Sequence, residues 1–317
     1  MKTSMVVISG SSNLPLSKGI CSYLGIPLGN AEVSRFPDGE IKVVIQQDVR
    51  GLDVFIIQPT CHPVNESVME LLIMIDALRR ASADRITAVI PYYGYARQDR
   101  KHEGRVPISA KLVANLLISA GANRILAMDL HASQIQGFFD IPCDHLSGVV
   151  VFAPIFKTFD RHNTVVMSPD IGSIKIARDF GDRLGMALAV IDKRRDFDGQ
   201  IEMPHIIGSV EGKTVLLVDD MITTGGTLCM AATALKSAGA KEIICAATHP
   251  VLVGSCIEKI NASAIDRVYV TDTIQLGAKA ALLPKCEVVS VAPLLGESIR
   301  RIHSNESVSW LFKNMVR

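Results

Sequence analysis

The sequence predicts an α/β fold in which mostly parallel sheets are flanked by helices, and two observations carry this prediction. Short β-branched apolar runs alternate with stretches of helical spacing through most of the 317 residues. The apolar runs are continuous rather than interrupted by polar residues, which is typical of strands covered on both faces. Strands and helices that alternate in this way indicate parallel sheets joined by helical crossovers.

The individual elements follow from the same patterns. Strands are expected at the β-branched runs Val6–Ser9, Val54–Gln58, Ile86–Ile90, Ile125–Asp129, Val165–Ser168, Ala187–Ile191, Thr214–Asp219, Ile243–Thr248 and Val268–Thr271. Helices are expected where apolar residues recur at helical spacing, in Asn65–Arg80, Ser109–Ser119, Lys175–Leu184, Thr227–Ala238 and Glu297–Met315.

The length of the chain, 317 residues, is too great for one ordinary core and suits two domains. Three segments end a helix, turn and start a strand in the same way: Ala81–Ile86, Ala120–Ile125 and Ala238–Ile243. This pattern fits a duplicated unit, and equally the general use of small residues in helix-to-strand loops. The expected domains are residues 1–147 and 148–296, followed by a helix in 297–317 that packs back on the first domain.

The composition limits the class of protein. Lys and Arg number 33 against 32 Asp and Glu, a net charge of +1, which argues against a general nucleic-acid binder. No window approaches the roughly 18 apolar residues of a membrane helix, and the apolar run near the N-terminus is too short for a signal peptide. The seven cysteines are scattered and never form a C-x-x-C pair, as expected of reduced thiols. We therefore expect a cytoplasmic protein without nucleic-acid or membrane partners.

The strongest local pattern is the segment Val215–Thr227. An apolar strand is followed by the acid pair Asp219 and Asp220, a loop rich in Gly and Thr, and a helix. Backbone N–H groups, hydroxyls and the positive end of the helix dipole then converge on an anion such as a phosphate. Ionised carboxylates beside a phosphate site suit the hydroxyls of a ribose. A simple Thr/Gly turn explains a short piece of this string but not its whole order, and the string lacks the Walker pattern.

This string resembles the signature for phosphoribosyl diphosphate (PRPP) that phosphoribosyltransferases share with phosphoribosyl diphosphate synthases, which are also called ribose-phosphate diphosphokinases. The resemblance to the synthases extends over nearly the whole chain. Its other blocks are Arg35-Phe-Pro-Asp-Gly-Glu40, Pro91–Asp99, Asp129–Ala132 with Gln134–Phe139, Ser168-Pro-Asp-Ile-Gly172 and Asp192-Lys-Arg-Arg195. It implies two phosphoribosyltransferase-like domains, each with a mostly parallel sheet, and transfer of the diphosphoryl group of ATP to ribose 5-phosphate.

The same resemblance implies roles for four residues that would otherwise be read as structural. Lys193 and Arg195 match a catalytic loop that lies over the transferred diphosphate, although a row of cations alone is most often a solvated turn. His131 and Asp170 match the residues that hold Mg²⁺, although magnesium ordinarily prefers oxygen ligands. The expected cofactor is therefore Mg²⁺, and the expected chemistry is positioning and charge neutralisation.

The substrate-binding residues are likewise implied by resemblance. The expected ATP-binding residues are Phe36, Asp38, Gly39, Glu40, Arg97, Gln98 and Asp99. The expected ribose-5-phosphate-binding residues are Arg195, Asp219, Asp220, Thr223, Thr224, Gly225, Gly226 and Thr227. In the family the block that contains Phe36 serves the active site of a neighbouring subunit, which implies a homo-oligomer, by resemblance a hexamer.

The sequence departs from the family pattern at Thr223, where the family commonly has Asp. Thr keeps a hydroxyl and the turn but loses a charge, so phosphate binding should survive. Two other functions stay open. A phosphoribosyltransferase that consumes PRPP needs only the Asp219–Thr227 loop, and a non-catalytic regulatory companion of the synthases would share the fold. The presence of Lys193, Arg195, His131 and Asp170 favours the catalytic synthase.

Overall fold

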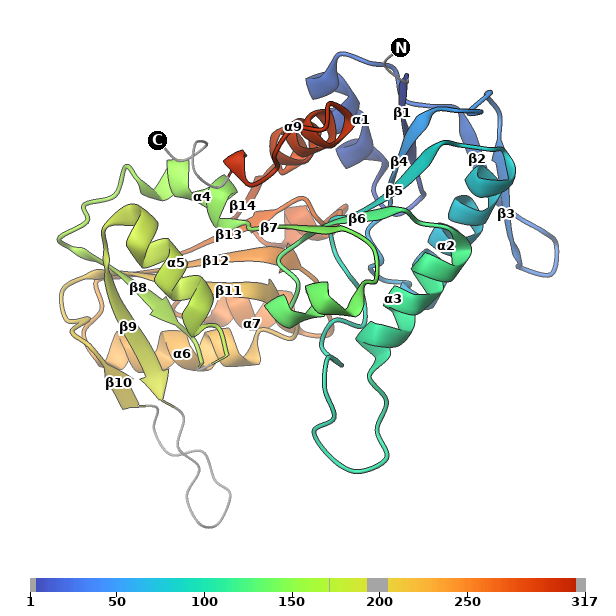
Figure 1. The fold of residues 1–317 in the computed structure, drawn as a ribbon. Helices are drawn as coiled ribbons and strands as arrows, with labels where there is room; N and C mark the ends of the chain where they lie inside the picture. Colours follow the sequence, from blue (N-terminus) through green and yellow to red (C-terminus); the bar gives the residue numbers. More distant parts are fainter. Residues whose placement is uncertain (1–3, 171, 193–204, 312–317) are drawn as a thin grey trace. The chain divides into compact units, whose positions relative to one another are not determined.

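The computed structural model describes residues 4–170, 172–192 and 205–311, which divide into two compact units (Figure 1). Of the described residues, unit 1 comprises 4–147, Thr273–Gln275 and 290–311, and unit 2 comprises 148–170, 172–192, 205–272 and Leu276–Val289. In the described part of the chain, no helix is long and apolar enough to cross a membrane. All seven cysteines are free thiols.

Unit 1 is built on a five-stranded sheet of order β1-β4-β5-β6-β7 in which every neighbouring pair is parallel. Its strands are β1 (Met5–Ser9), β4 (Asp53–Ile57), β5 (Arg85–Ile90), β6 (Arg124–Met128) and β7 (Cys143–Leu146). Every residue of β4 is buried, as expected of a strand covered on both faces.

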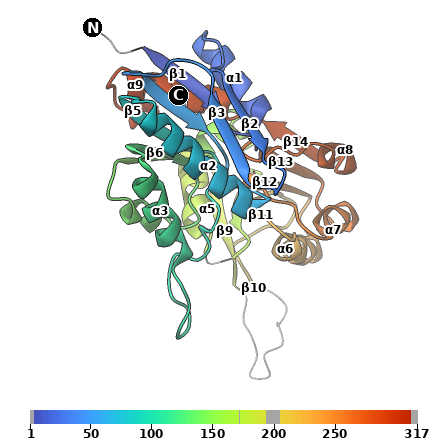
Figure 2. The same ribbon diagram turned by 90° about the vertical axis from the view of Figure 1, so that its right-hand side faces the viewer.

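The helices of unit 1 lie on both sides of this sheet (Figures 1 and 2). On one side, α2 (Val64–Arg80) and α3 (Ser109–Ala120) bury apolar side chains against the strands. On the other, α1 (Leu14–Leu24) packs beside α9 (Ala292–His303). Their approach is close, because a Cβ built at Gly19 would lie 3.0 Å from the Cβ of Ala292. A short 3-10 helix, η1 (Ser133–Phe138), follows β6 along the chain.

The last helix differs from the expected Glu297–Met315. It begins five residues earlier, at Ala292, with a proline in its first turn, where the missing N–H of proline has no partner to lose. It ends at His303 because Asn305 adopts a left-handed backbone conformation with a φ of 56°. The N–H of Glu306 then donates to the carbonyl of Arg301 at 2.7 Å and closes the helix end.

Unit 2 is built on a seven-stranded sheet of order β10-β9-β8-β11-β12-β13-β14. All pairs are parallel except that of β9 with β10. The strands are β8 (Thr164–Ser168), β9 (Ala187–Asp192), β10 (His205–Ile207), β11 (Thr214–Ile222), β12 (Glu242–Pro250), β13 (Arg267–Thr271) and β14 (Cys286–Val289). β11 lies at the centre of this sheet.

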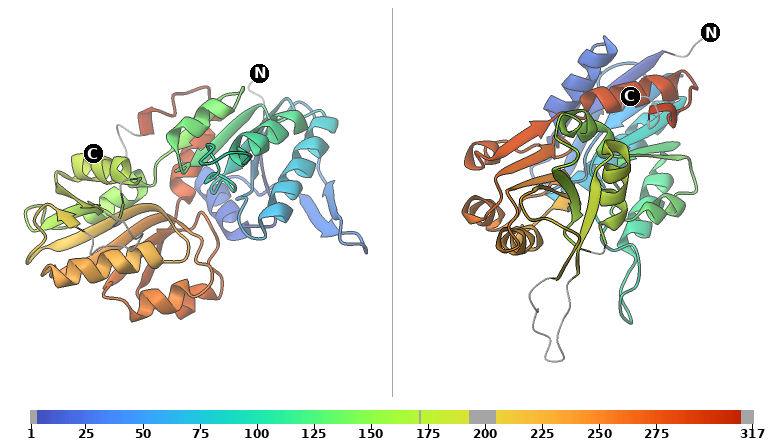
Figure 3. Two further views of the ribbon diagram at one scale, coloured as in Figure 1. Left: turned by 90° about the horizontal axis from the view of Figure 1, so that it is seen from below. Right: turned by 90° about the vertical axis from the view of Figure 1, so that its left-hand side faces the viewer.

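Two apolar cores cover the two faces of the unit 2 sheet. Leu216 packs with α4 (Val149–Phe156) and α5 (Ile174–Leu184), whereas its neighbours Val215 and Leu217 pack with α6 (Gly226–Ser237) and α7 (Cys256–Ala262). This alternation follows from the two-residue period of a strand. Figure 3 shows α6 and α7 on one side of the sheet and α4 and α5 on the other. The short helix α8 (Lys279–Leu282) precedes β14.

Candidate active site

The Asp219–Thr227 segment forms a strand–loop–helix connection in unit 2. β11 continues to Ile222, past the acid pair, because its last two residues still pair with β12. The expected end of this strand, Asp219, was therefore wrong. Asp219 and Asp220 both lie within β11, before its last two residues. The loop is short, since α6 begins at Gly226.

The loop has a backbone shape that only glycine adopts freely at position 225. Gly225 has a φ of 72°, and a Cβ built there would lie 3.0 Å from the Sγ of Cys256. The carbonyl of Thr223 accepts the N–H of Val253 at 3.0 Å, which fixes the start of the loop. The first N–H groups of α6 have no partners within the helix, and Thr224 is exposed beside them. The segment thus has the geometry of an anion site.

The acid pair lies in a cluster of carboxylates. Asp220 is buried, with 7% of its surface exposed, and its N–H donates to the Oδ1 of Asp219 at 2.9 Å. Ser173, just before α5, also donates to this Oδ1, through its hydroxyl at 2.5 Å. The N–H of Ser173 donates to the Oδ1 of Asp170 at 3.1 Å. The structure therefore brings together Asp170, Asp219 and Asp220, and it adds Ser173, which the sequence analysis missed.

The surroundings of Asp219 favour its neutral form. Burial raises the pKa of Asp219, and the nearby carboxylate of Asp220 raises it further, to about 7. The hydroxyl of Ser173 stabilises the ionised form and works in the opposite direction. An ionised carboxylate that is buried beside a second carboxylate destabilises the fold at neutral pH. Groups with such raised pKa values are typical of binding and catalytic sites.

Replacing Asp219 with asparagine should raise the thermal stability of the metal-free protein near pH 8 and change it little near pH 4. The folded protein holds the Asp219 proton more tightly than the unfolded chain, so stability falls as the pH rises from about 4 to about 7. Asparagine has no such proton, and we expect a midpoint about 2–5 °C higher near pH 8. Calorimetry at both pH values measures this, with the exposed Asp182 on α5, changed to asparagine, as control. A lower midpoint of the Asp219 variant near pH 8 would contradict the prediction.

In unit 1 the Arg35–Glu40 block forms the tip of a hairpin. β2 (Ala31–Arg35) and β3 (Ile41–Ile45) pair antiparallel, and the N–H of Phe36 donates to the carbonyl of Glu40 at 2.8 Å. Phe36 is 46% exposed, and the ammonium of Lys42 lies 5.9 Å from the centre of its ring. The carboxylates of Asp38 and Glu40 are exposed as well. The tip thus presents an aromatic face and two acceptors, and Gly39 turns the chain between them.

The Arg97–Asp99 block follows β5 and lies beside the segment that follows β6. The Oδ2 of Asp99 accepts a hydrogen bond from the Nε2 of Gln134, in η1, at 2.9 Å. Gln98 is tied to the start of α3, where its carbonyl accepts the N–H of Ala110 at 3.2 Å. Arg97 and His131 are both exposed. Within unit 1, the structure therefore gathers these predicted residues beyond the carboxyl ends of neighbouring strands, the edge where α/β sheets bind ligands.

The expected metal ligands and the catalytic loop are only partly described. His131 belongs to unit 1 and Asp170 to unit 2, while Lys193 and Arg195 lie outside the described residues. The described residues include no group of three or more His, Cys, Asp or Glu that could hold a metal ion. The carboxylate chemistry of Asp170 and its neighbours still fits Mg²⁺, because this ion commonly takes one or two carboxylates and completes its shell with water and substrate phosphates.

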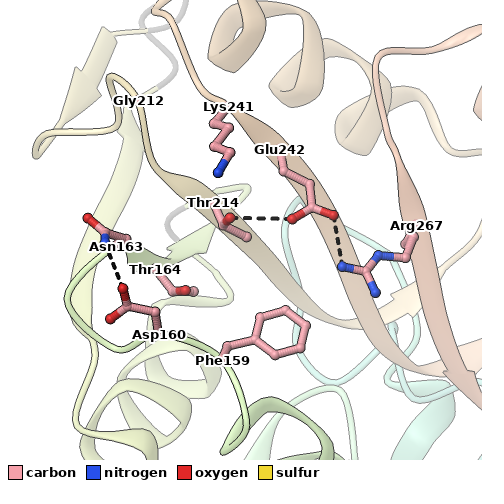
Figure 4. A pocket seen from close by; sticks show the side chains of 9 residues that line it. All are labelled: Phe159, Asp160, Asn163, Thr164, Gly212, Thr214, Lys241, Glu242 and Arg267. Atoms are coloured by element: carbon pink, nitrogen blue, oxygen red, sulfur yellow. Dashed lines mark hydrogen bonds and ion pairs between the residues drawn. The ribbon is translucent and has the colours of Figure 1, made fainter.

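A separate cavity of about 480 Å³ in unit 2 is lined by none of the predicted site residues, and Figure 4 shows its lining. It is lined at the amino ends of the strands, by Thr164 of β8, Thr214 of β11, Glu242 of β12 and Arg267 of β13. Glu242 already accepts hydrogen bonds from Arg267 at 2.8 Å and from Thr214 at 3.3 Å. Because the acid pair and the glycine loop lie toward the opposite ends of the strands, this cavity is not part of the candidate active site.

The parallel sheet, the acid pair and the glycine loop that opens a helix define the class of α/β proteins that bind phosphoribosyl groups. Residues 5–121 match the N-terminal domain of ribose phosphate pyrophosphokinase, and residues 200–313 match the phosphoribosyl synthetase-associated domain. The chain belongs to the ribose-phosphate pyrophosphokinase family.

Relatives of known name agree with this assignment over nearly their whole length. The ribose-phosphate pyrophosphokinase of Wolinella succinogenes is 54% identical over 306 residues, which cover 96% of this chain and 98% of the relative. That of Thermotoga maritima is 55% identical over 314 residues and covers 98% of both chains. The crystal structure of phosphoribosylpyrophosphate synthetase from Mycobacterium smegmatis matches with a TM-score of 0.90 at 41% identity, covering 96% of this chain and 100% of that one.

Proposed function

We propose that this chain transfers the diphosphoryl group of Mg-ATP to the 1-hydroxyl of ribose 5-phosphate and releases PRPP and AMP. The arrangement of β11, the Gly225 loop and α6 carries this proposal. It offers an anion site next to carboxylates that can accept hydrogen bonds from ribose hydroxyls. High identity to named pyrophosphokinases along the whole chain supports the same reaction.

The ribose end of the site belongs to unit 2. Thr223, Thr224, Gly225, Gly226 and Thr227 bind the 5-phosphate through N–H groups and hydroxyls. Asp219 and Asp220 bind the ribose hydroxyls and so orient the 1-hydroxyl as the attacking group. Holding the two reactants in line converts a bimolecular reaction into an effectively unimolecular one, and this can account for a large part of the rate.

The ATP end of the site uses the exposed groups of unit 1. The Phe36 ring stacks on the adenine, and Asp38 and Glu40 accept hydrogen bonds from its amino group, with Gly39 shaping the turn. Arg97 binds the phosphates, for which a planar guanidinium is suited, with Gln98 and Asp99 beside it. The exposure of Phe36 supports use of the hairpin tip by a neighbouring subunit of a homo-oligomer, which we propose to be a hexamer.

Cations neutralise the charge of the transferred group. His131 and Asp170 would hold Mg²⁺, which lowers the charge on the phosphate oxygens when it is bound. Lys193 and Arg195 bind the same oxygens as charge moves toward the leaving AMP, and Arg195 also contacts the ribose phosphate. The described part of the site offers no obvious general base, so positioning and electrostatic stabilisation supply most of the rate. The seven free thiols suit the reducing cytoplasm as the compartment.

A coupled assay for AMP tests the reaction. The purified chain is incubated with ATP and Mg²⁺, with and without ribose 5-phosphate, and AMP and PRPP are both measured. We expect the two products in equal amounts and only when the sugar phosphate is present. Well-folded protein that stays inactive, also with added inorganic phosphate and Mn²⁺, would contradict the proposal and favour a regulatory companion. Consumption of PRPP with a nucleobase would favour a phosphoribosyltransferase.

A further inference from the structure

Ser173 occupies the residue before α5, yet its hydroxyl is not used on that helix. A serine at this position ordinarily accepts an N–H of the first turn through its side chain. The carbonyl of Ser173 does accept the N–H of Ala177 at 3.1 Å, so the backbone is in the capping position. Within the described residues, however, the Ser173 side chain makes no capping hydrogen bond. Its hydroxyl is directed instead toward the carboxylates of the candidate active site.

The contacts of Ser173 join two of these carboxylates. Its Oγ lies 2.5 Å from the Oδ1 of Asp219 and 3.3 Å from the Oδ1 of Asp170. A hydroxyl has one proton and donates to one acceptor at a time. The shorter distance assigns that proton to Asp219, while the N–H of Ser173 holds Asp170 at 3.1 Å. Because Ser173 is only 7% exposed, water competes little for these bonds.

Asp219 and Asp170 each have a second point of attachment, Asp219 through its carboxylate and Asp170 through its backbone carbonyl. The Oδ1 of Asp219 also accepts the N–H of Asp220 at 2.9 Å, so two donors fix the plane of this carboxylate. The carbonyl of Asp170 accepts the hydroxyl of the fully buried Ser168 at the end of β8. Ser173 thus connects the loop after β8 to the middle strand of the sheet, at the acid pair.

We propose that Ser173 is a positioning residue for the sugar substrate. Its hydroxyl orients the Asp219 carboxylate toward the ribose hydroxyls, and its backbone N–H keeps Asp170 at a fixed place beside it. This inference rests on the proposed function and deepens it, because it names the residue that sets the geometry of the ribose end of the site. In this role Ser173 acts through the Asp219 carboxylate that its hydroxyl holds, so its removal is expected to affect sugar binding through Asp219.

The test compares three variants of the full chain: Ser173→Ala, Ser173→Thr and, as a matched control, Ser255→Ala. Ser255 precedes α7 in the same unit, and in the described structure its side chain makes no capping bond either. Loss of a hydrogen bond to a charged group changes affinity by about 10-fold or more. We therefore expect Ser173→Ala to raise KM for ribose 5-phosphate about 10-fold and to leave KM for ATP nearly unchanged. Threonine, which keeps the hydroxyl, should restore most of the sugar affinity.

A residue with a merely structural role would give another pattern. Unchanged kinetics of Ser173→Ala, or an equal rise of both KM values without rescue by threonine, would overturn the inference while the proposed function stands. If the wild-type chain makes no PRPP, the proposed function fails separately. The inference is then tested by calorimetric binding of ribose 5-phosphate. An affinity of Ser173→Ala about 10-fold below that of the wild type would support it; equal affinities, or no binding by the wild type, would overturn it.

Discussion

Replacing Gly225 with alanine should lower kcat/KM for ribose 5-phosphate by about 100-fold, the size of loss that a displacement of about 1 Å produces in a site built for positioning. Two structural reasons combine at this residue. Its φ of 72° costs an alanine roughly 1–2 kcal/mol, and the added Cβ would lie 3.0 Å from the Sγ of Cys256. Relief of the backbone strain or of the contact with Cys256 requires the loop to move, and this movement turns the N–H groups at the start of α6 away from the phosphate.

The control for this prediction is Gly185→Ala at the end of α5. Gly185 has a similar φ of 65°, and in the described structure a Cβ built there meets no heavy atom within 4 Å apart from those of its immediate chain neighbours. Gly185→Ala therefore measures the cost of the backbone conformation alone. It adds no contact like that of Gly225 with Cys256, and it does not alter the phosphate loop. We expect both variants to lose some thermal stability, and only Gly225→Ala to lose sugar affinity and turnover. Comparable activity of the two variants would contradict the assignment of the loop to the 5-phosphate.

Replacing Lys193 with alanine should lower kcat by about 10²–10³-fold and change KM for ATP only slightly. The expected role of Lys193 is to bind oxygens whose charge grows as the bond to AMP breaks. An interaction that is strongest in the transition state contributes to turnover more than to substrate binding. Steady-state kinetics with varied ATP separates the two parameters.

A suitable control for Lys193 is Lys236, which is exposed on the last turn of α6. At about 1.5 Å of rise per residue, it lies more than two turns of helix from the loop at the start of α6. Lys236→Ala also removes one positive charge from unit 2, so it shows what general electrostatic attraction contributes. A Lys193 variant with normal kcat and a raised KM for ATP would refute the catalytic role and leave only a role in binding.

The α/β class could be predicted from the sequence because buried parallel strands leave a direct mark on it. The runs at β4, β5, β8 and β13 are continuous and apolar, and the structure places strands there within one or two residues. The helix α4 was missed for the opposite reason. It is apolar on nearly all sides and contains Pro154, so it shows no amphipathic period. The hairpin β2–β3 was also missed, because its strands are only half-buried and lie between polar residues.

The candidate site divides in the same way between local and distant features. The Asp219–Thr227 loop was predictable, since strand, acids, glycines and helix are contiguous in the chain. The predicted end of β11 was wrong by three residues. Pairing with β12 extends the strand, and no local sequence pattern indicates that pairing. Ser173 was missed because its contact with Asp219 spans 46 residues and depends on where α5 begins. A serine just before a predicted helix was its only signal in the sequence, and that signal indicates a helix cap.

The most direct test of the reaction follows the phosphorus atoms of ATP. The chain is incubated with Mg²⁺, ribose 5-phosphate and ATP labelled at the β-phosphorus or, in a parallel reaction, at the α-phosphorus. If the sugar hydroxyl attacks the β-phosphorus, the β-label is found in PRPP and the α-label stays in AMP. Label from the α-phosphorus in the sugar product, or release of only the γ-phosphoryl group, would show that the chain performs a different transfer.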